Sequence, residues 1–153
     1  MSQQPDGAGA FGYDPGMATP ASFVAPDGLA FALLVEERPD YLFAEVTGPQ
    51  DSLEVSVAFW RQLADEAARR QAGKLMVVDR LEGTPLDPAG MAMLVTRLVG
   101  FGLERIRIAY VEPTAEHMPA MEHGEIFAQE LGFTARVFGD AGHADRWLRY
   151  GSP

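Results

Sequence analysis

Residues 74–79 read Lys-Leu-Met-Val-Val-Asp, and this stretch, together with the Asp87-Pro88 pair that follows it, decides the fold class. Its run of consecutive apolar residues predicts a central strand that is buried on both faces. Asp87 and Pro88 predict the start of a helix, with an acceptor side chain at the N-cap and proline at the first helical position. A buried strand followed by a helix is the repeating unit of an α/β protein with a parallel sheet.

The same alternation continues on both sides of this stretch. Strands are expected over four further segments, Ala30–Glu36, Tyr41–Thr47, Arg105–Val111 and Thr134–Phe138. Helices are expected over Ser52–Ala72, from Asp87-Pro88 up to Gly100 and Gly102, over Thr114–Leu131, and in a short segment after Asp140. Because strand-helix units wind into parallel sheets by right-handed crossovers, we predict an α/β fold with a mostly parallel five-stranded sheet, an antiparallel first strand and four helices.

The segment Ser52–Ala72 has a clear helical pattern. Asp51 and Glu54 have the spacing of a capping box at its start, and Gly73 follows its end. Apolar residues recur along it at helical spacing: Leu53, Val57, Trp60, Leu63, Ala64 and Ala67. This stripe predicts that the helix packs against the sheet, with Trp60 as its largest inward side chain.

Residues 1–27 differ in composition from the rest of the chain. They contain four glycines, four prolines and three acidic residues, with no basic residue. Such a segment lacks the pattern of a helix or strand, so we expect a flexible Gly/Pro-rich tail over residues 1–27 and a single domain over residues 28–153. The alternative is a strap that lays Phe11, Tyr13 and Phe23 on an apolar surface.

The alternation within the expected strands predicts a sheet with two unlike faces. One face is wholly apolar, and the other is mixed. The residues expected on the mixed face are Tyr41, Phe43, Glu45, Arg107 and Arg136. If the long helices lie mainly on the apolar side, the mixed face stays partly open for a tail, a ligand or a second subunit, and we expect a homodimer.

Charge and composition exclude several classes of function. The 153 residues include 12 Lys and Arg against 22 Asp and Glu, a formal net charge of -10, which repels phosphate backbones and anionic lipid. The absence of cysteine excludes disulfides, zinc-thiolate sites and thiol nucleophiles, and fits a reducing compartment. With no secretory signal and no long apolar run, we expect a cytoplasmic protein without nucleic-acid or membrane partners.

The segment His117–Glu125 contains metal-ligand residue types, namely two histidines among carboxylates. However, His117 and His123 are six residues apart, so they point to different sides of an ideal helix. Pro119 marks the first helical turn and leaves His117 in the preceding loop. We interpret the segment as a helix start; the alternative is a metal or acid-base site.

Asp79 and Asp87 flank the carboxyl edge of the predicted sheet, where ligands of open parallel sheets bind. They suggest an acid-base pair, but Asp87 has a sufficient role as a helix cap, and Asp79 can accept from backbone N–H groups of its loop. We therefore expect no catalytic residue, no metal and no cofactor.

Several strings resemble the STAS superfamily, the fold of bacterial anti-sigma factor antagonists (SpoIIAA-like). The first string is Leu86-Asp87-Pro88-Ala89-Gly90-Met91, which is similar to the family's Asp-Ser-Ser-Gly or Asp-Ser-Ala-Gly at the start of its second helix. The others follow it in order: Arg107–Val111, Glu130–Phe133, Val137–Asp140 and Ala144–Leu148. The resemblance covers residues 29–150 and implies a stand-alone bacterial STAS-like domain.

The chain departs from this pattern at the phosphorylated serine. In anti-sigma factor antagonists a kinase modifies a serine just before the glycine, and the added charge blocks the partner interface. Here Pro88 and Ala89 precede Gly90, and neither has a hydroxyl group. The usual phosphoswitch is therefore chemically impossible, and Thr84 is the nearest acceptor in the preceding loop.

The resemblance implies a non-catalytic regulatory or protein-interaction module. Its partner surface would lie around the second helix start and include Thr84, Asp87, Ala89 and Met91. One alternative is a small-molecule binding protein that holds an apolar or lipid-like anion between sheet and helices, which an enclosed cavity of ~300 Å³ or more would favour. The other is an unrecognised enzyme that uses the segment His117–Glu125.

Overall fold

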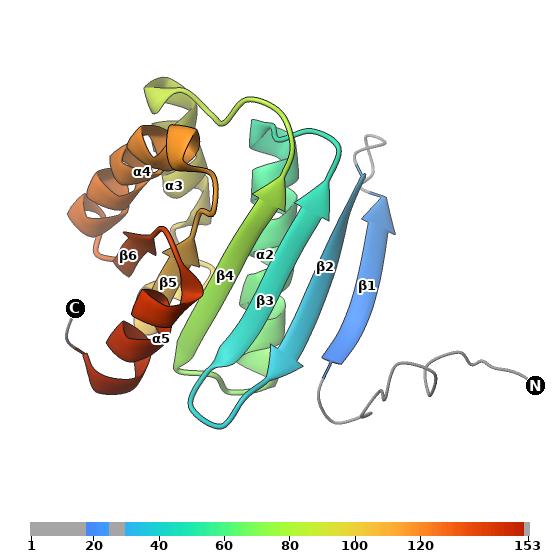
Figure 1. Cartoon of the computed structure of the whole chain (residues 1–153), viewed down its shortest axis with the longest axis vertical. Helices are drawn as coiled ribbons and strands as arrows, with labels where there is room; N and C mark the ends of the chain where they lie inside the picture. Colours follow the sequence, from blue (N-terminus) through green and yellow to red (C-terminus); the bar gives the residue numbers. More distant parts are fainter. Residues whose placement is uncertain (1–17, 25–29, 152–153) are drawn as a thin grey trace, which may run out of the picture.

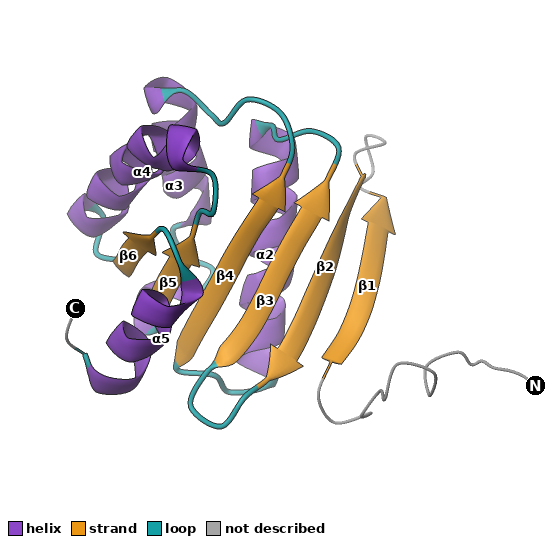
Figure 2. Ribbon diagram, viewed as in Figure 1, coloured by secondary structure: helices purple, strands orange, loops and turns teal. Residues whose placement is uncertain are grey.

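A computed structural model describes residues 18–24 and 30–151, and in this part of the chain one six-stranded sheet is flanked by four α-helices (Figures 1 and 2). The strands are β1 (Ala18–Val24), β2 (Ala30–Glu37), β3 (Leu42–Gly48), β4 (Lys74–Leu81), β5 (Arg107–Val111) and β6 (Thr134–Phe138). The helices are α2 (Leu53–Arg69), α3 (Pro88–Leu98), α4 (Met118–Glu130) and α5 (Ala141–Tyr150). Two short 3₁₀ turns, η1 (Leu103–Arg105) and η2 (Ala115–His117), precede β5 and α4.

The order of the strands in the sheet follows their order in the chain. β2 and β3 form an antiparallel hairpin, closed by a hydrogen bond of 3.0 Å from the Arg38 N–H to the Tyr41 carbonyl. β3, β4, β5 and β6 are parallel, and a helix connects each to the next. The predicted α/β fold, with its antiparallel first strand, parallel remainder and four helices, is confirmed.

β1 is a strand that the sequence prediction missed. It lies within residues 1–27, which we expected to be a tail, and pairs antiparallel with β2 from Ala18 opposite Glu36 to Val24 opposite Ala30. The tail prediction is therefore wrong for Ala18–Val24, because the backbone of β2 offers a row of hydrogen-bonding groups that a segment of modest strand propensity can satisfy. The expected strap residues Phe11 and Tyr13 lie outside the described residues.

The apolar face of the sheet is covered by α2, α3 and α4, and in Figure 1 α2 lies behind the strands. The inward side chains of β2 and β3 alternate with half-buried ones, as the period-two pattern predicts. From α2 the buried apolar residues are Val55, Phe59, Trp60, Leu63, Ala64 and Ala67. The predicted inward position of Trp60 is confirmed, and its side chain is 8% exposed.

The opposite face holds a second, smaller core, and α5 lies in front of it in Figure 1. Trp147 and Leu148 of α5 pack there on the expected mixed face of the sheet. Tyr41 is buried and donates a hydrogen bond of 2.6 Å from its hydroxyl to Asp145 Oδ1. The guanidinium of Arg107 lies 4.5 Å from the Trp147 ring centre.

The face of the sheet around Tyr41 and Arg107 is therefore not open, contrary to our expectation, because the apolar side of α5 packs against it. Arg136 also lies near α5, 5.9 Å from the Trp147 ring centre. Phe43 and Glu45 are half-buried: the Arg38 guanidinium lies 3.8 Å from the Phe43 ring centre, and Glu45 pairs with Arg80. The homodimer stays a prediction.

No helix within residues 18–24 and 30–151 combines the length and the apolar character that a membrane crossing requires.

Candidate functional site

The carboxyl ends of β4 and β5 hold a hydrogen-bonded pair of polar side chains, Asp79 and Tyr110. Asp79 is 5% exposed and accepts a hydrogen bond of 2.8 Å from the Leu81 N–H to Oδ1. Its other oxygen accepts from the Tyr110 hydroxyl. Burial raises the pKa of Asp79, while these two hydrogen bonds oppose the rise. The pKa of Tyr110 is raised well above its usual value by burial and by the neighbouring Asp79 charge.

Asp51 lies near this pair, in the loop between β3 and α2. Its backbone N–H donates to the Glu82 carbonyl at 2.8 Å, and its Oδ1 accepts from the Ser56 hydroxyl at 3.0 Å. Burial is the main cause that raises the pKa of Asp51 to about 6, and the charge of Asp79 adds to the rise. This carboxyl therefore titrates close to neutral pH.

The expected capping box of Asp51 and Glu54 is wrong by one residue. Ser52 is the N-cap of α2, and its hydroxyl accepts from the Val55 N–H at 3.1 Å. Because Ser52 caps the helix, the Asp51 carboxylate instead accepts the hydrogen bond from Ser56, one turn into α2. Ser56 is itself 4% exposed, a buried hydroxyl on the inward side of α2.

Glu112 is, with Asp79, a fully buried acid at this edge of the sheet, and it is 2% exposed. Its Oε2 accepts from the Thr114 N–H at 3.1 Å and lies 3.7 Å from His117 Nδ1. Burial is the main cause that raises the pKa of Glu112, and the charges of Asp79 and Asp51 add to the rise. These interactions place Glu112 and His117 in the same electrostatic cluster as Asp51 and Asp79.

The structure separates the polar residues of the segment His117–Glu125. His117 lies before α4 beside Glu112, as the position of Pro119 predicted, whereas His123 is exposed on the helix. Glu125 Oε2 accepts from the Val137 N–H at 3.1 Å. Among the described residues, no set of three or more histidine and carboxylate side chains is arranged to hold a metal ion.

The residues expected to form a partner surface are divided between surface and core. Thr84, Asp87 and Ala89 are exposed, whereas Met91 is 5% exposed and points inward. Met91 is therefore corrected to a core position, because it begins the inward stripe of α3. Asp87 caps α3 by accepting from the Gly90 N–H at 2.7 Å, which confirms the predicted cap and separates its role from that of the buried Asp79.

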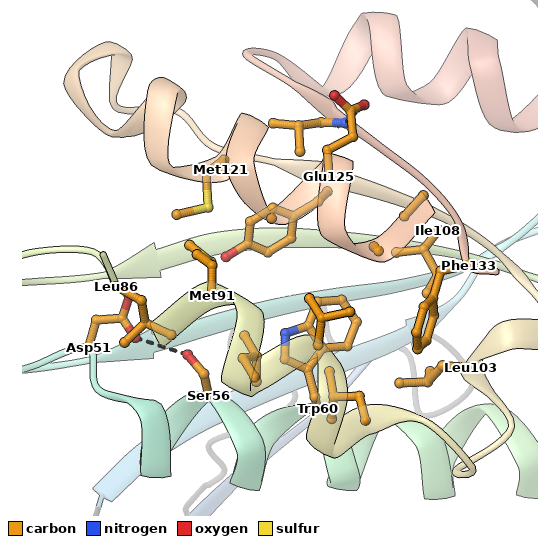
Figure 3. A pocket seen from close by; sticks show the side chains of 18 residues that line it. Asp51, Ser56, Trp60, Leu86, Met91, Leu103, Ile108, Met121, Glu125 and Phe133 are labelled. Atoms are coloured by element: carbon orange, nitrogen blue, oxygen red, sulfur yellow. Dashed lines mark hydrogen bonds between the residues drawn. The ribbon is translucent and has the colours of Figure 1, made fainter. Parts of the chain in front are cut away.

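An apolar cavity of about 100 Å³ lies between the sheet and helices α2, α3 and α4 (Figure 3). Its wall includes Met91, Met121, Ile108, Leu103 and Phe133. In Figure 3 the Asp51–Ser56 pair lies at one end of the cavity, and Leu103 and Phe133 lie toward the other. The cavity is thus apolar over most of its length and acidic at one end.

Trp60 lines the middle of this cavity. Its ring stacks on Tyr110 with a centre-to-centre distance of 5.9 Å, and it is one helical turn from Ser56. Among the residues that the structure describes, its indole N–H has no hydrogen-bond partner. In Figure 3 the indole nitrogen lies on the side of the ring toward Ser56. A buried donor without a partner is uncommon, because its desolvation is not offset.

Sequence reasoning missed Asp51, Ser56 and Glu112 as members of one cluster. One sequence signal for Ser56 was present. Ser56 lies one helical turn before Trp60, so it places a polar hydroxyl on the apolar, inward side of α2. No local signal joins Glu112 to Asp51, since they meet only when strands and helices pack.

Comparisons of the chain with known protein families, with curated proteins and with solved structures find no match.

The raised pKa of Asp51 makes a testable prediction about stability. The folded protein binds this proton more tightly than the unfolded chain, whose carboxyl has the usual value of 3.8, so the free energy of unfolding falls as pH rises from about 4 through 6. We expect Asp51→Asn to be more stable than the parent by about 1 kcal/mol at pH 7.5, after solvent screening at this partly exposed group, and equal to it near pH 4.

Urea denaturation at both pH values measures this difference. The matched control is Asp65→Asn, which removes the same charge from an exposed position of α2. An Asp51→Asn variant that is less stable at pH 7.5 would show that the ionised carboxylate stabilises the fold.

Proposed function

We propose that this chain is a non-catalytic protein-interaction module whose partner binds the exposed start of α3. The observation that carries the proposal is that Asp87 and Ala89 are exposed at the capped start of α3. Thr84 is exposed in the loop that precedes this helix. The Asp87 cap and Pro88 at the start of α3 hold this turn, so little conformational entropy is lost when a partner binds. The resemblance to anti-sigma factor antagonists points to the same surface.

The charge of the chain suggests the chemistry of the partner. The formal net charge is -10, and Glu82 and Asp87 are both exposed near this turn. A protein with a basic contact surface would be attracted by these carboxylates, and its association would weaken at high salt. The proposed setting is the bacterial cytoplasm, with regulation that does not use the serine phosphoswitch and with a homodimer as the proposed form of the protein.

Substitution of Ala89 by arginine tests the surface. Ala89→Arg places a long cation in the proposed interface, and we expect it to weaken partner binding at least tenfold by steric overlap and charge repulsion. The matched control is Ala141→Arg, because Ala141 is also exposed in the first turn of a helix that an aspartate caps, here Asp140 of α5.

The measurement is affinity capture from the native organism with the parent and both variants, followed by calorimetry on the purified partner. The proposal requires a protein that the parent and Ala141→Arg bind equally and Ala89→Arg does not. Capture that Ala89→Arg leaves unchanged contradicts the proposed surface, and so does capture of no protein by the parent.

A further inference from the structure

We propose that the cavity between the sheet and helices α2, α3 and α4 binds a small neutral alcohol or phenol, with its hydroxyl group beside the Trp60 indole N–H, on the side of the Asp51–Ser56 pair. This site is distinct from the α3 surface, and a ligand there does not depend on a protein partner. Three observations carry the proposal: the apolar wall of the cavity, the unpartnered indole N–H and the carboxylate at one end.

The size and wall of the cavity define the body of the ligand. The volume of about 100 Å³ is much smaller than the sites of drug-sized ligands, which measure roughly 300 Å³ or more. In another protein an apolar cavity of about 150 Å³ takes benzene, so one six-membered ring is the upper limit for the apolar body of the ligand here. Leucine, methionine and aromatic side chains line most of the wall, which favours a hydrocarbon ring or short chain.

Trp60 requires a hydrogen-bond acceptor in the ligand. Trp60 is 8% exposed, and its indole N–H can only donate. An acceptor atom next to this N–H would offset the free energy that the buried donor otherwise costs. An ammonium group has no acceptor, so a ligand that enters the cavity with an ammonium head would leave the indole N–H unpartnered.

The Asp51–Ser56 pair at this end of the cavity favours a ligand group that can also donate. The Asp51 carboxylate has about four acceptor positions, and the Ser56 hydroxyl and the Ser52 N–H occupy two of them. A carboxylate ligand would have no proton to donate and would be repelled by Asp51 and Asp79. A hydroxyl group both donates and accepts, so it can accept from the Trp60 indole and donate to the Asp51–Ser56 pair. The lipid-like anion considered from the sequence is therefore the disfavoured ligand.

Three probes of similar size test the proposal on the full chain. Phenol carries the hydroxyl, benzene lacks it, and benzoate replaces it with a charge. We expect phenol to bind about tenfold more tightly than benzene, and benzoate to bind more weakly than both. Affinities are measured from the chemical shifts of the Met91 and Met121 methyl groups, which line the cavity.

The indole N–H resonances report where phenol binds. The chain has two tryptophans, and Trp147 lies in the core on the opposite face of the sheet. Phenol should shift the Trp60 indole proton to lower field, as hydrogen bonding does, and leave that of Trp147 unchanged. Absence of any shift at Trp60 and at both methionines overturns the proposal, and so does benzene binding as tightly as phenol.

One variant and one control test the contact between the hydroxyl group and Trp60. Trp60→Phe keeps an aromatic ring and removes the N–H, so phenol should lose most of its tenfold advantage over benzene. Asp65→Asn on the exposed side of α2 should keep that advantage in full. If Trp60→Phe retains the parental ratio, the indole does not bind the hydroxyl, and the proposal fails. Because the ratio of the two affinities is compared, a general loss of stability does not produce the expected result.

Discussion

Trp60→Ala is expected to lower the free energy of unfolding by about 3–5 kcal/mol, because it removes a large ring from the main core. The Trp60 ring is in contact with Phe59 at 5.5 Å and with Tyr110 at 5.9 Å between ring centres. It also lines the cavity, so its removal enlarges an existing void. Urea denaturation followed by circular dichroism measures the change.

Arg61→Ala is the control for this prediction. Arg61 is the next residue of α2, is exposed, and lies 4.9 Å from the Phe101 ring centre. Loss of this single exposed contact is expected to change the free energy of unfolding by less than about 1 kcal/mol. A Trp60→Ala variant with the parental denaturation midpoint would mean that the inward stripe of α2 is misplaced.

Trp147→Ala is expected to have a similar effect, about 3–5 kcal/mol, on the other face of the sheet. Trp147 is 5% exposed, and its ring centre lies 5.7 Å from that of Phe138. Without it, α5 loses its largest contact, and the buried Tyr41 face becomes accessible. We therefore expect both a lower denaturation midpoint and self-association that increases with concentration, which light scattering measures.

Tyr150→Ala provides the comparison within the same helix. Tyr150 is 74% exposed, so its removal should change the free energy of unfolding by less than about 0.5 kcal/mol and leave the association state unchanged. If Trp147→Ala behaves like Tyr150→Ala, α5 is not what covers this face, and the mixed face is open as the sequence first suggested.

The main elements of the fold could be predicted because their signals are local. The apolar run of Leu75–Val78 is a buried strand in the centre of the sheet, and Asp87 caps α3. Asp140 likewise caps α5 by accepting from the His143 N–H at 2.9 Å. The boundaries were less accurate: β5 begins at Arg107 rather than Arg105, because a 3₁₀ turn over Leu103–Arg105 precedes it.

The candidate site was predictable only in part, since its residues come from separate elements. Asp79 was identified from its place at the end of a buried strand. Asp51 was assigned to a helix cap, and only the packed structure shows that Ser52 holds that role and that Asp51 bonds Ser56. The pKa of Asp51, about 6, depends on burial and on Asp79, neither of which its local sequence contains.

Local sequence therefore determined which segments are strands and helices, through apolar period, caps and turn residues, together with the parallel order that short strand-helix units impose. Tertiary structure alone decided three things: that Ala18–Val24 joins the sheet, that α5 covers the Tyr41 side, and that a cavity lies beside Trp60. The physical reason is that an edge of a sheet, a face of a helix and a void are defined by what packs against them. Such contacts join residues that are distant in the chain, and no local pattern records them.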